Sequence, residues 1–374
     1  MADDKVELLI DGRLYAGWEQ ASVSRAMDAA AGTFSLTVLD RWSGQSEPWD
    51  IEPGDACEVR VGGETLITGY VDRVRPRFSA MEHSIQVQGR DRSGDLVDCS
   101  AVHDPDEWKN IGLQKLADIL AAPFGISVKA ETDLGDPIEL VKLNHGESVL
   151  EAINRHARMR KVLVMPDGRG NILLTRTGAR TAAVELVQGR NVLAADGTLD
   201  WSERFSEYIV KGQAGYSEDT DGETEAHVEA RAEDAYVDRY RPLLLITDTD
   251  ATNATAQERA TWEANTRIGM SAEAGITVQG WRQTKGGPLW EPNMLVTVRL
   301  PWLQLEGEML IRQVTFNKGP GGTTTDLDIV SPQAYAADPP DGKQGKKTKG
   351  KKGKKGEKKG NSWMSVIPED VRNG

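Results

Sequence analysis

Short runs of alternating apolar and polar residues dominate the first hundred positions of the chain. Residues 6–10 and 34–38 place an apolar side chain at every second position. Alternation with a period of two is typical of strands that bury one face. Asp11-Gly12 follows the first run and favours a tight hairpin turn. The pattern predicts about six short strands within residues 5–99, arranged as a small barrel or sandwich.

One pattern of three strands occurs twice, about 240 residues apart. Each copy has a turn that begins with Glu-Pro, then an alternating strand, a second strand and a third. The copies are residues 52–61, 66–74 and 84–88, and residues 291–300, 307–314 and 326–330. The repeat predicts two related β-modules. A chain with the same module twice is more often part of an assembly than the frame of a single catalytic pocket.

The segment between the repeats has a different period. Apolar residues recur at helical spacing over 113–120, and Pro123 ends that helix. Ser148 and Glu151 have the spacing of a capping box at the start of a second helix. Residues 162–174 contain two apolar runs around a Gly-rich turn, which predicts a hairpin. The segment is therefore predicted to be a small α+β insert.

These patterns predict an α+β fold that is mainly β, with two related small, tube-like β-barrel modules. A strand with Phe205, Tyr208 and Val210 is expected to open the second module, and a helix is expected from Ala254 to about Ala274. The predicted domains are a first barrel (1–100), the α+β insert (101–182), a second barrel with an inserted loop and helix (183–337), and a flexible tail (338–374).

The charge of the chain is unevenly distributed. The formal net charge is −13, yet residues 341–360 contain ten Lys and only two acids, so the rest of the chain is more acidic than the total. An acidic body argues against broad binding to duplex DNA. No apolar run is long enough for a membrane helix and the N-terminus does not resemble a signal peptide, so no stable membrane insertion is expected. Cys57 and Cys99 are expected to be reduced thiols, with a disulfide as the alternative.

No pattern of catalytic residues is recognisable, and no catalytic residue, metal or cofactor is predicted. The chain has no Gly-x-Ser-x-Gly elbow, phosphate-binding loop or His-Glu-x-x-His helix, and its five His are scattered. Residues 217–222 partly resemble a calcium loop, but Val228 stands where a bidentate Glu is expected, which favours a plain acidic loop.

Six Trp residues lie near predicted strand ends, where they either fill the core or form a belt at a subunit interface. They are Trp18, Trp42, Trp49, Trp281, Trp290 and Trp302.

The C-terminal segment combines a basic linker with an apolar peptide. The Lys/Gly composition of residues 341–360 predicts disorder. This linker, which includes Lys351 and Lys352, is either a solvated tether or a contact for DNA, a tape-measure protein or an acidic partner. The peptide beyond it carries three residues that are expected to bind a partner, Trp363, Met364 and Ile367.

Several motifs resemble the tail hub protein of Mu-type contractile bacteriophages and prophages. The resemblance covers nearly all of residues 5–335, and residues 89–100 are its most specific part. The motifs are Gly17-Trp18, residues 22–25, 32–36 and 89–100, Gly146-Glu147-Ser148, Asp167-Gly168, residues 173–176, Gly280-Trp281-Arg282 and residues 289–293. The Lys/Gly tail has no counterpart in this resemblance.

The resemblance implies a structural role in the virion, with synthesis in the cytoplasm of the host bacterium. Such hubs form a homotrimeric ring of pseudo-sixfold symmetry between the tail tube or its initiator and the central spike, and they also contact other baseplate proteins. DNA passes through this ring during host-cell entry. The alternative function is a tail module that acts on the envelope by binding or cleaving peptidoglycan or another glycan.

Overall fold

The computed structural model describes residues 5–39, 50–79, 83–158, 160–213, 227–246 and 253–335. The chain divides into two compact units. The first holds the described residues up to Asp196 together with Ala274–Arg299 and Glu308–Ile329. The second holds Gly197–Glu273, Leu300–Gly307 and the described residues from Val330. No helix in these ranges is long and apolar enough to cross a membrane.

The N-terminal part of the first unit is a seven-stranded antiparallel arrangement. Its strands lie in the spatial order β3-β4-β7-β6-β5-β1-β2. Residues Val6, Leu8 and Ile10 are buried, as their alternation predicts, and Asp11 and Gly12 take the positive φ values of a tight turn. The strands are β1 (Val6–Ile10), β2 (Arg13–Tyr15), β3 (Gln20–Ala26), β4 (Thr33–Leu39), β5 (Ala56–Val61), β6 (Glu64–Phe78) and β7 (His83–Asp91).

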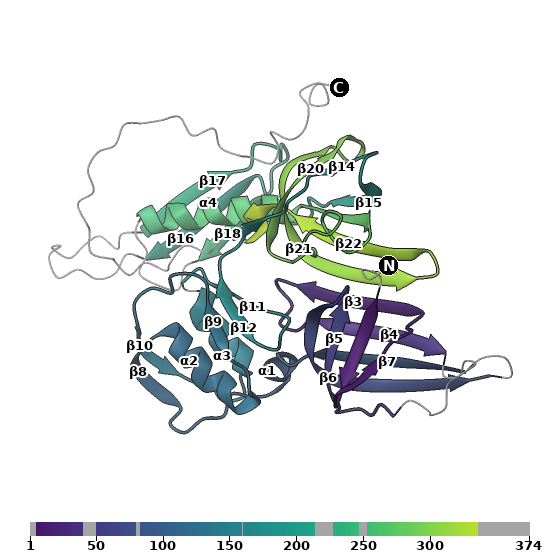
Figure 1. The fold of residues 1–374 in the computed structure, drawn as a ribbon. Coiled ribbons are helices and arrows are strands. Elements are labelled where there is room, and N and C mark those ends of the chain that lie inside the picture. Colours follow the sequence, from purple (N-terminus) through teal and green to yellow (C-terminus); the bar gives the residue numbers. More distant parts are fainter. Residues whose placement is uncertain are drawn as a thin grey trace. The chain divides into compact units, whose positions relative to one another are not determined.

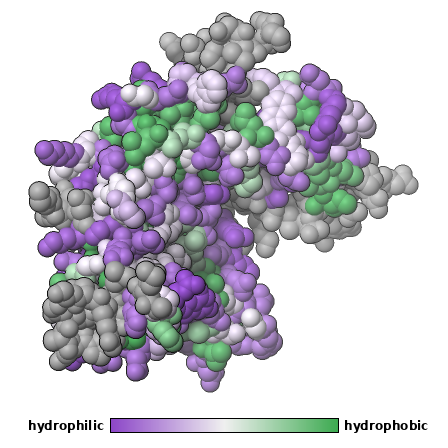
Figure 2. Space-filling view, turned by 90° about the vertical axis from the view of Figure 1, so that its right-hand side faces the viewer, coloured by the Kyte–Doolittle hydropathy of each residue, from purple (hydrophilic) through white to green (hydrophobic). Residues whose placement is uncertain are grey.

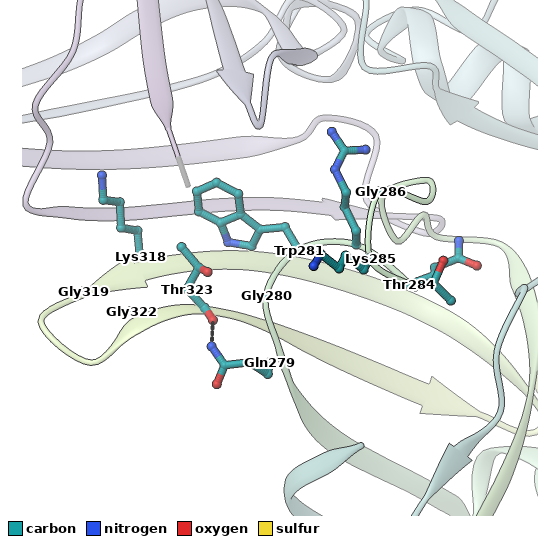
Figure 3. Close-up of a pocket in the computed structure, with 12 residues that line it drawn as sticks. Gln279, Gly280, Trp281, Thr284, Lys285, Gly286, Lys318, Gly319, Gly322 and Thr323 are labelled. Atoms are coloured by element: carbon teal, nitrogen blue, oxygen red, sulfur yellow. Dashed lines mark hydrogen bonds between the residues drawn. The ribbon is translucent and has the colours of Figure 1, made fainter. Parts of the chain in front are cut away.

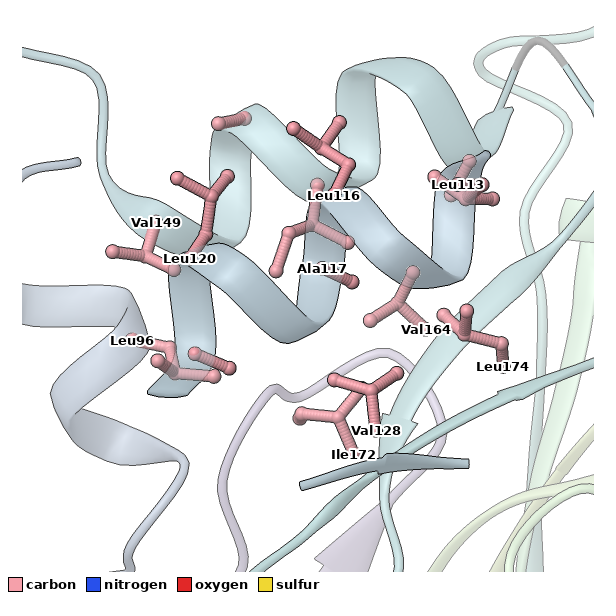
Figure 4. Packing of buried hydrophobic residues seen from close by; sticks show 14 of the residues in the cluster. Leu96, Leu113, Leu116, Ala117, Leu120, Val128, Val149, Val164, Ile172 and Leu174 are labelled. Carbon is pink, nitrogen blue, oxygen red and sulfur yellow. The ribbon is translucent and has the colours of Figure 1, made fainter. Parts of the chain in front are cut away.

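The insert packs two helices on a small sheet around its own core (Figure 4). Leu116 and Leu120 from one helix and Ile153 from the other are buried against Ile172 and Leu174. The sheet order is β11-β12-β9, and β8 pairs with β10. The elements are α1 (Gly94–Asp98), β8 (Glu107–Ile111), α2 (Leu113–Ala121), the 3-10 helix η1 (Ala122–Phe124), β9 (Val128–Ala130), β10 (Ile138–Lys142), α3 (Val149–Arg158), β11 (Leu163–Pro166) and β12 (Ile172–Thr175).

Local signals explain the bounds of the insert helices. The Ser148 amide donates to Glu151 Oε2 at 2.8 Å and the Glu151 amide donates to Ser148 Oγ at 3.2 Å. This reciprocal pair is the capping box that the sequence predicts, and it starts α3. Gly125 ends η1 in the left-handed conformation, which glycine adopts without steric cost.

The second meander repeats the strand order of the first. Its strands lie in the order β15-β19-β22-β21-β20, and β13 and β14 add to the far side of β20. The first meander has the order β3-β4-β7-β6-β5, and β1 adds to the far side of β5. The strands are β13 (Arg180–Thr181), β14 (Leu186–Val187), β15 (Val192–Leu199), β19 (Ala272–Gln279), β20 (Met294–Leu300), β21 (Leu305–Gly319) and β22 (Gly322–Val330).

The two meanders form one 14-stranded sheet, because β21 pairs with β3 (Figure 1). Among the described residues, the strand order runs from β15 to β2 without returning on itself. The mainly β character is confirmed. The two closed barrels stay a prediction, as do the domain limits at residues 100, 182 and 337.

The second unit contains a three-stranded sheet and the longest helix. The sheet order is β17-β16-β18. Arg204 is fully buried and donates to both carboxylate oxygens of Asp234, at 2.7 and 2.8 Å, beneath the Trp201 ring. The elements are β16 (Glu207–Gln213), β17 (His227–Glu233), β18 (Pro242–Ile246), α4 (Asn253–Met270) and the 3-10 helices η2 (Pro301–Leu303) and η3 (Pro332–Tyr335).

Two sequence predictions for this region differ from the structure. The strand with Tyr208 and Val210 belongs to the separate β16 sheet rather than to the second meander, because Val210 packs with Ala256 and Ala260 of α4. Helix α4 ends at Met270, four residues before the predicted end, and residues 272–279 form β19 instead. The β-branched residues of that segment favour a strand over a helix.

Candidate assembly interface

The junction between the meanders is an antiparallel pairing of two distant strands. Residues 313–318 of β21 lie opposite residues 21–26 of β3. On the polar face of this pairing, Thr315 Oγ1 donates a hydrogen bond to Ser24 Oγ at 3.1 Å. Cross-strand hydroxyl pairs of this kind stabilise a sheet modestly. The backbone ladder and these side chains join the two modules edge to edge.

The opposite face of the junction is apolar. Phe316 is 2% exposed, and Val23 and Val314 are fully buried. The Met27 amide extends the ladder with a bond to the Arg312 carbonyl at 2.9 Å. Burial of a Phe side chain contributes about 1.5–3 kcal/mol relative to its exposure. The junction is therefore part of the core of the first unit.

Arg282 makes a second link between the meanders. Its guanidinium donates to Glu64 Oε1 at 2.7 Å and to the Gly62 carbonyl at 3.1 Å, both at the turn between β5 and β6. A third bond, to the Gly287 carbonyl at 2.8 Å, fixes the loop that carries it. The Gly280-Trp281-Arg282 motif thus ties the second meander to the first.

A cavity of about 580 Å³ lies beside this link, between the loop of residues 279–286 and the β21–β22 hairpin (Figure 3). Trp281 Nε1 donates to the Asn317 carbonyl at 3.0 Å, and Gln279 donates to the Thr323 carbonyl at 2.8 Å. The lining includes Lys285 but no acid, His or Cys. Its side chains carry no acid–base pair of the kind that hydrolysis requires.

A buried arginine anchors the insert to the first meander. Arg25 in β3 donates to the Pro166 carbonyl in β11 at 3.4 Å. Gly168 lies so close to Arg25 and to the Leu66 carbonyl that a Cβ there would approach them within 3 Å. Burial lowers the pKa of Arg25, and the nearby carboxylates of Glu291 and Asp91 oppose that shift. The Asp167-Gly168 turn is therefore required for close packing.

Close packing also explains the glycine at the start of the segment of residues 89–100. A Cβ on Gly89 would lie 2.1 Å from the Tyr70 carbonyl and 2.5 Å from the Phe34 ring. A Cβ on Gly69 would lie 1.9 Å from the Arg90 carbonyl. Only glycine fits where strands β6 and β7 approach each other and the Phe34 ring. These glycines therefore permit the close approach of β6 and β7 just before the insert.

Charged residues of this segment are held in fixed pairs. Arg90 donates to Asp98 at 2.7 Å and to Asp72 at 2.9 Å, and the hydrogen bond with Asp98 is the main cause that raises the pKa of Arg90. Asp91 accepts from the Ser93 amide and hydroxyl at 3.0 and 2.8 Å. Burial nevertheless raises the pKa of Asp91. These contacts hold the segment in a fixed conformation, which indicates a structural role.

The predicted partner-binding residues lie outside the described part of the chain, namely Trp363, Met364, Ile367, Lys351 and Lys352. The acidic loop of residues 217–222 lies outside it too, and so do Trp42 and Trp49. Of the other Trp residues near strand ends, Trp18, Trp281 and Trp290 are buried and Trp302 is 85% exposed.

Neither a metal site nor a disulfide is found among the described residues. No group of three His, Cys, Asp or Glu in those ranges has the geometry to hold a metal ion. Cys57 is buried and Cys99 is exposed, and both are free thiols.

Hydrophilic residues cover most of the face in Figure 2, and hydrophobic residues there form separate patches.

Comparison with known proteins gives matches along most of the chain. Residues 5–91 match the family described as Mu phage baseplate assembly protein GpP-like, N-terminal. Residues 93–176 match the second domain of baseplate hub protein gp44-like, and residues 252–338 match the fourth domain of Mu phage baseplate assembly protein GpP. Baseplate hub protein gp44 of Escherichia phage Mu is 36% identical over 318 residues, which is 83% of each chain. This chain belongs to the family of Mu-type baseplate hub proteins.

Solved structures agree with this family. The 43 kDa tail protein of prophage MuSo2 from Shewanella oneidensis is 35% identical to the hub, with a TM-score of 0.79 over 90% of this chain and 100% of that one. The tail protein from Neisseria meningitidis MC58 has the same fold at 22% identity, with a TM-score of 0.72 over 90% of this chain and 98% of that one. The resemblance drawn from the sequence motifs is confirmed. The hub is a structural component of the baseplate of a Mu-like phage tail, and hence of the virion.

The sequence did not predict the residues that join the modules. The β21–β3 pairing and the Arg282 bridge to Glu64 were both missed. One signal was present. The second strand of each copy extends well beyond the repeated residues, because β6 and β21 each have 15 residues. Strands of this length reach past their own module and leave edges available for pairing.

Proposed function

We propose that three copies of the hub form a ring with pseudo-sixfold symmetry between the tail tube and the central spike. The observation that carries this proposal is the repeated strand order within one chain, joined edge to edge through β3 and β21. Three chains then present six similar modules. A ring of six similar units in threefold arrangement meets both a sixfold tube and a threefold spike.

In this proposal the sheets of the six modules line a tube-like wall through which DNA passes. The net charge of −13 supports passage rather than binding, because an acidic wall repels phosphates. The partners are a tail tube or tube-initiator protein on one side, the spike on the other, and further baseplate proteins around the rim.

Electron microscopy of the full-length hub, alone and mixed with the spike and tube proteins of its own phage, tests this proposal. Rings with threefold symmetry and six similar lobes are expected in at least one of these samples. Single compact particles in all of them, at concentrations up to tens of micromolar, would contradict it.

We also propose that the C-terminal peptide with Trp363, Met364 and Ile367 docks on a partner protein. Apolar residues beyond a long hydrophilic linker support this role. The linker, including Lys351 and Lys352, contacts DNA, a tape-measure protein or an acidic partner. Truncation after Pro340 is expected to weaken assembly with spike and tube, whereas K351Q/K352Q removes two of the ten Lys charges of the linker and keeps the peptide, so it tests the contribution of these two residues. Normal assembly of the truncated chain would refute the docking role.

The proposed role is structural, without catalysis. The curated relative is named as a hub protein, and the cavity beside Trp281 has no acid–base pair in its lining. The competing idea is cleavage or binding of peptidoglycan or another envelope glycan. A peptidoglycan zymogram is expected to show no clearing at the position of the hub, and clearing that survives purification would overturn the structural assignment.

A further inference from the structure

Each meander has one long strand edge with no partner among the described residues. In β6, residues 64–70 pair with β5, whereas residues 73–78 pair only with β7. Strand β15 is the end strand of the sheet, and among the described strands it pairs only with β19, apart from an isolated bridge between its first residue, Val192, and Gln188. Unpaired edges present backbone donors and acceptors that can pair with another chain.

These two edges are the counterparts of the edges that already pair inside the chain. In the repeated strand order, β6 occupies the place of β21 and β15 occupies the place of β3. Strands β6 and β21 have the same length, and so do β7 and β22. The internal β21–β3 junction is therefore a template for a contact between copies.

We propose that β6 of one copy pairs with β15 of a second copy, in the antiparallel register that joins β21 to β3 within the chain. This contact deepens the ring proposal and rests on it. Each copy offers one edge of each kind, so the contact is heterologous and three copies can close it into a ring.

The register requires one residue of β6 and the residue of β15 that lies opposite it, and the comparison of β6 with β21 gives the first of these. In the sequence repeat, Val74 corresponds to Val314, so Arg77 corresponds to Asn317. Asn317 lies opposite Ser22 in β3. The residue of β15 that corresponds to Ser22 therefore faces Arg77 of the neighbouring copy.

The second half of the register comes from β15. With the separation of 240 residues that relates Val74 to Val314, Asp326 in β22 corresponds to Gln86 in β7. Thr277 in β19 bonds to Asp326, and Thr37 in β4 lies opposite Gln86, so Thr277 corresponds to Thr37. Two residues earlier, Gly275 corresponds to Ser35, which lies opposite Ser22. The carboxylate of Asp196 lies over Gly275. Asp196 is thus the counterpart of Ser22 and faces Arg77.

The charges on the two edges are complementary in this register. Arg77 faces Asp196, and four residues along, Arg73 faces Asp200. All four side chains are exposed, and within the described residues neither arginine side chain forms an ion pair or hydrogen bond. The same face of the internal junction has uncharged pairs such as Thr315 with Ser24. Opposite charges directly across a strand pair are favourable, and like charges are not.

This charge pattern also selects the partner. Antiparallel pairing of β6 with another β6 would bring arginines together, because Arg73, Arg75 and Arg77 share one face. Pairing of β15 with another β15 would bring Asp196 and Asp200 together. Each edge therefore favours the other kind of edge, as repulsion against the wrong pairing gives specificity.

The other face of the proposed contact covers exposed apolar side chains. Phe78 is 82% exposed and Leu199 is 57% exposed, whereas Phe316 at the internal junction is 2% exposed. Pro76 has no amide proton, so the ladder has one donor fewer than the internal one. Proline is tolerated at such an edge, and the bonds of Val74 and Phe78 flank it.

A disulfide tests the register directly. The Met27 amide bonds to the Arg312 carbonyl, so these two residues form a hydrogen-bonded pair of the ladder. Because bonded and non-bonded pairs alternate, Asn317 and Ser22 form a pair without backbone hydrogen bonds. In the proposed register, Arg77 and Asp196 form a pair of the same non-bonded kind. Such pairs have Cα atoms about 4.5 Å apart, which suits a disulfide. In a Cys99→Ser background, R77C/D196C is expected to give covalently closed trimers after mild oxidation, detected by non-reducing electrophoresis.

Two controls make this result specific to the register. The single variants R77C and D196C should give no cross-linked ladder, because neither edge pairs with itself. R77C/A195C shifts the pairing by one residue and points the two sulfurs to opposite faces, so its cross-linking yield should fall at least about tenfold. Equal yields from R77C/D196C and R77C/A195C would refute the register.

Charge reversal gives an independent readout. R73D/R77D places acids opposite acids and is expected to raise the protein concentration at which half of the hub is assembled about tenfold or more. R73D/R77D/D196R/D200R inverts both charge pairs and is expected to restore assembly. Circular dichroism of each variant confirms that it folds. Assembly of R73D/R77D equal to that of the unmodified hub would contradict the contact.

The outcomes separate this contact from the ring proposal. If the unmodified hub forms trimers while R77C/D196C does not cross-link, the ring stands and the β6–β15 contact is wrong. If the unmodified hub stays monomeric even with spike and tube proteins, both proposals fail. Cross-linked trimers from R77C/D196C alone support both.

Discussion

Thr315 in β21 donates a hydrogen bond to Ser24 in β3, although 291 residues separate them along the chain. This bond lies on the polar face of a strand pairing whose other face is part of the core. The two ends of the described chain therefore fold against each other. The repeated modules act as one sheet because of this pairing.

Loss of the apolar face of this junction should destabilise the first unit. Phe316→Ala is expected to lower the free energy of unfolding by about 3–5 kcal/mol, because the surrounding side chains cannot fill the cavity. Urea unfolding measures this change. Tyr240→Ala is the control, since Tyr240 is 87% exposed, and its effect should stay within about 0.5 kcal/mol. Similar losses in both variants would show that the junction is not a core.

Gly89 should not tolerate a side chain. Gly89→Ala places a Cβ 2.1 Å from the Tyr70 carbonyl, so the strands must separate, and an unfolding midpoint several degrees lower is expected. Gly112→Ala is the matched control, because no atom lies within 4 Å of its added Cβ and its φ is −70°. Thermal unfolding followed by circular dichroism compares them. An unchanged midpoint for Gly89→Ala would contradict the close approach.

The sequence predicted local elements better than the way they combine. The alternation at Val6 and Leu8 and the Ser148–Glu151 capping box are local signals, and both correspond to the observed elements. The membership of a strand in a sheet is not local. Tyr208 has the alternation of a meander strand, yet its strand packs on α4, because a separate apolar helix face is available there.

The interface residues were less predictable for the same physical reason. Arg282 and Glu64 meet because two distant turns come together, and no spacing in the sequence encodes that meeting. Glycines such as Gly89 are visible as a motif, but the clash that requires them appears only once Phe34 is in place. Sequence similarity identified the family, and the three-dimensional contacts supplied the reasons for its motifs.

Stability should fall as the solution becomes mildly acidic, in part because of His156. Its side chain is buried in α3, and neither ring nitrogen has a hydrogen-bond partner among the described residues. Burial, followed by the nearby Arg155 and Arg160, lowers the pKa of His156. As pH falls below about 6.5, the unfolded chain takes up a proton that the folded chain does not, so stability decreases.

Urea unfolding at pH 7.5 and 5.5 measures this dependence. His156→Phe removes the titrating group and should reduce the loss of stability between the two values. His145→Phe is the control at an exposed histidine and should leave the loss unchanged. The explanation fails if the loss is the same in His156→Phe and the unmodified hub.

The two thiols should differ in reactivity. Burial raises the pKa of Cys57 to about 12, and nearby Asp55 adds to the shift, so almost no thiolate is present at pH 8. Cys99 is exposed. Iodoacetamide at pH 8 should therefore modify only Cys99 in the folded protein and both residues after denaturation, as mass spectrometry can show. Rapid modification of Cys57 under native conditions would mean that its strand opens readily.

The central claim is that two modules per chain become six in a closed assembly of three. Native mass spectrometry of the full-length hub, alone and with its spike and tube proteins, measures this stoichiometry directly. The expected result is a species with three hub chains that persists on dilution into the low micromolar range. A single hub chain under every condition, or a stable assembly of two or four, would contradict the account.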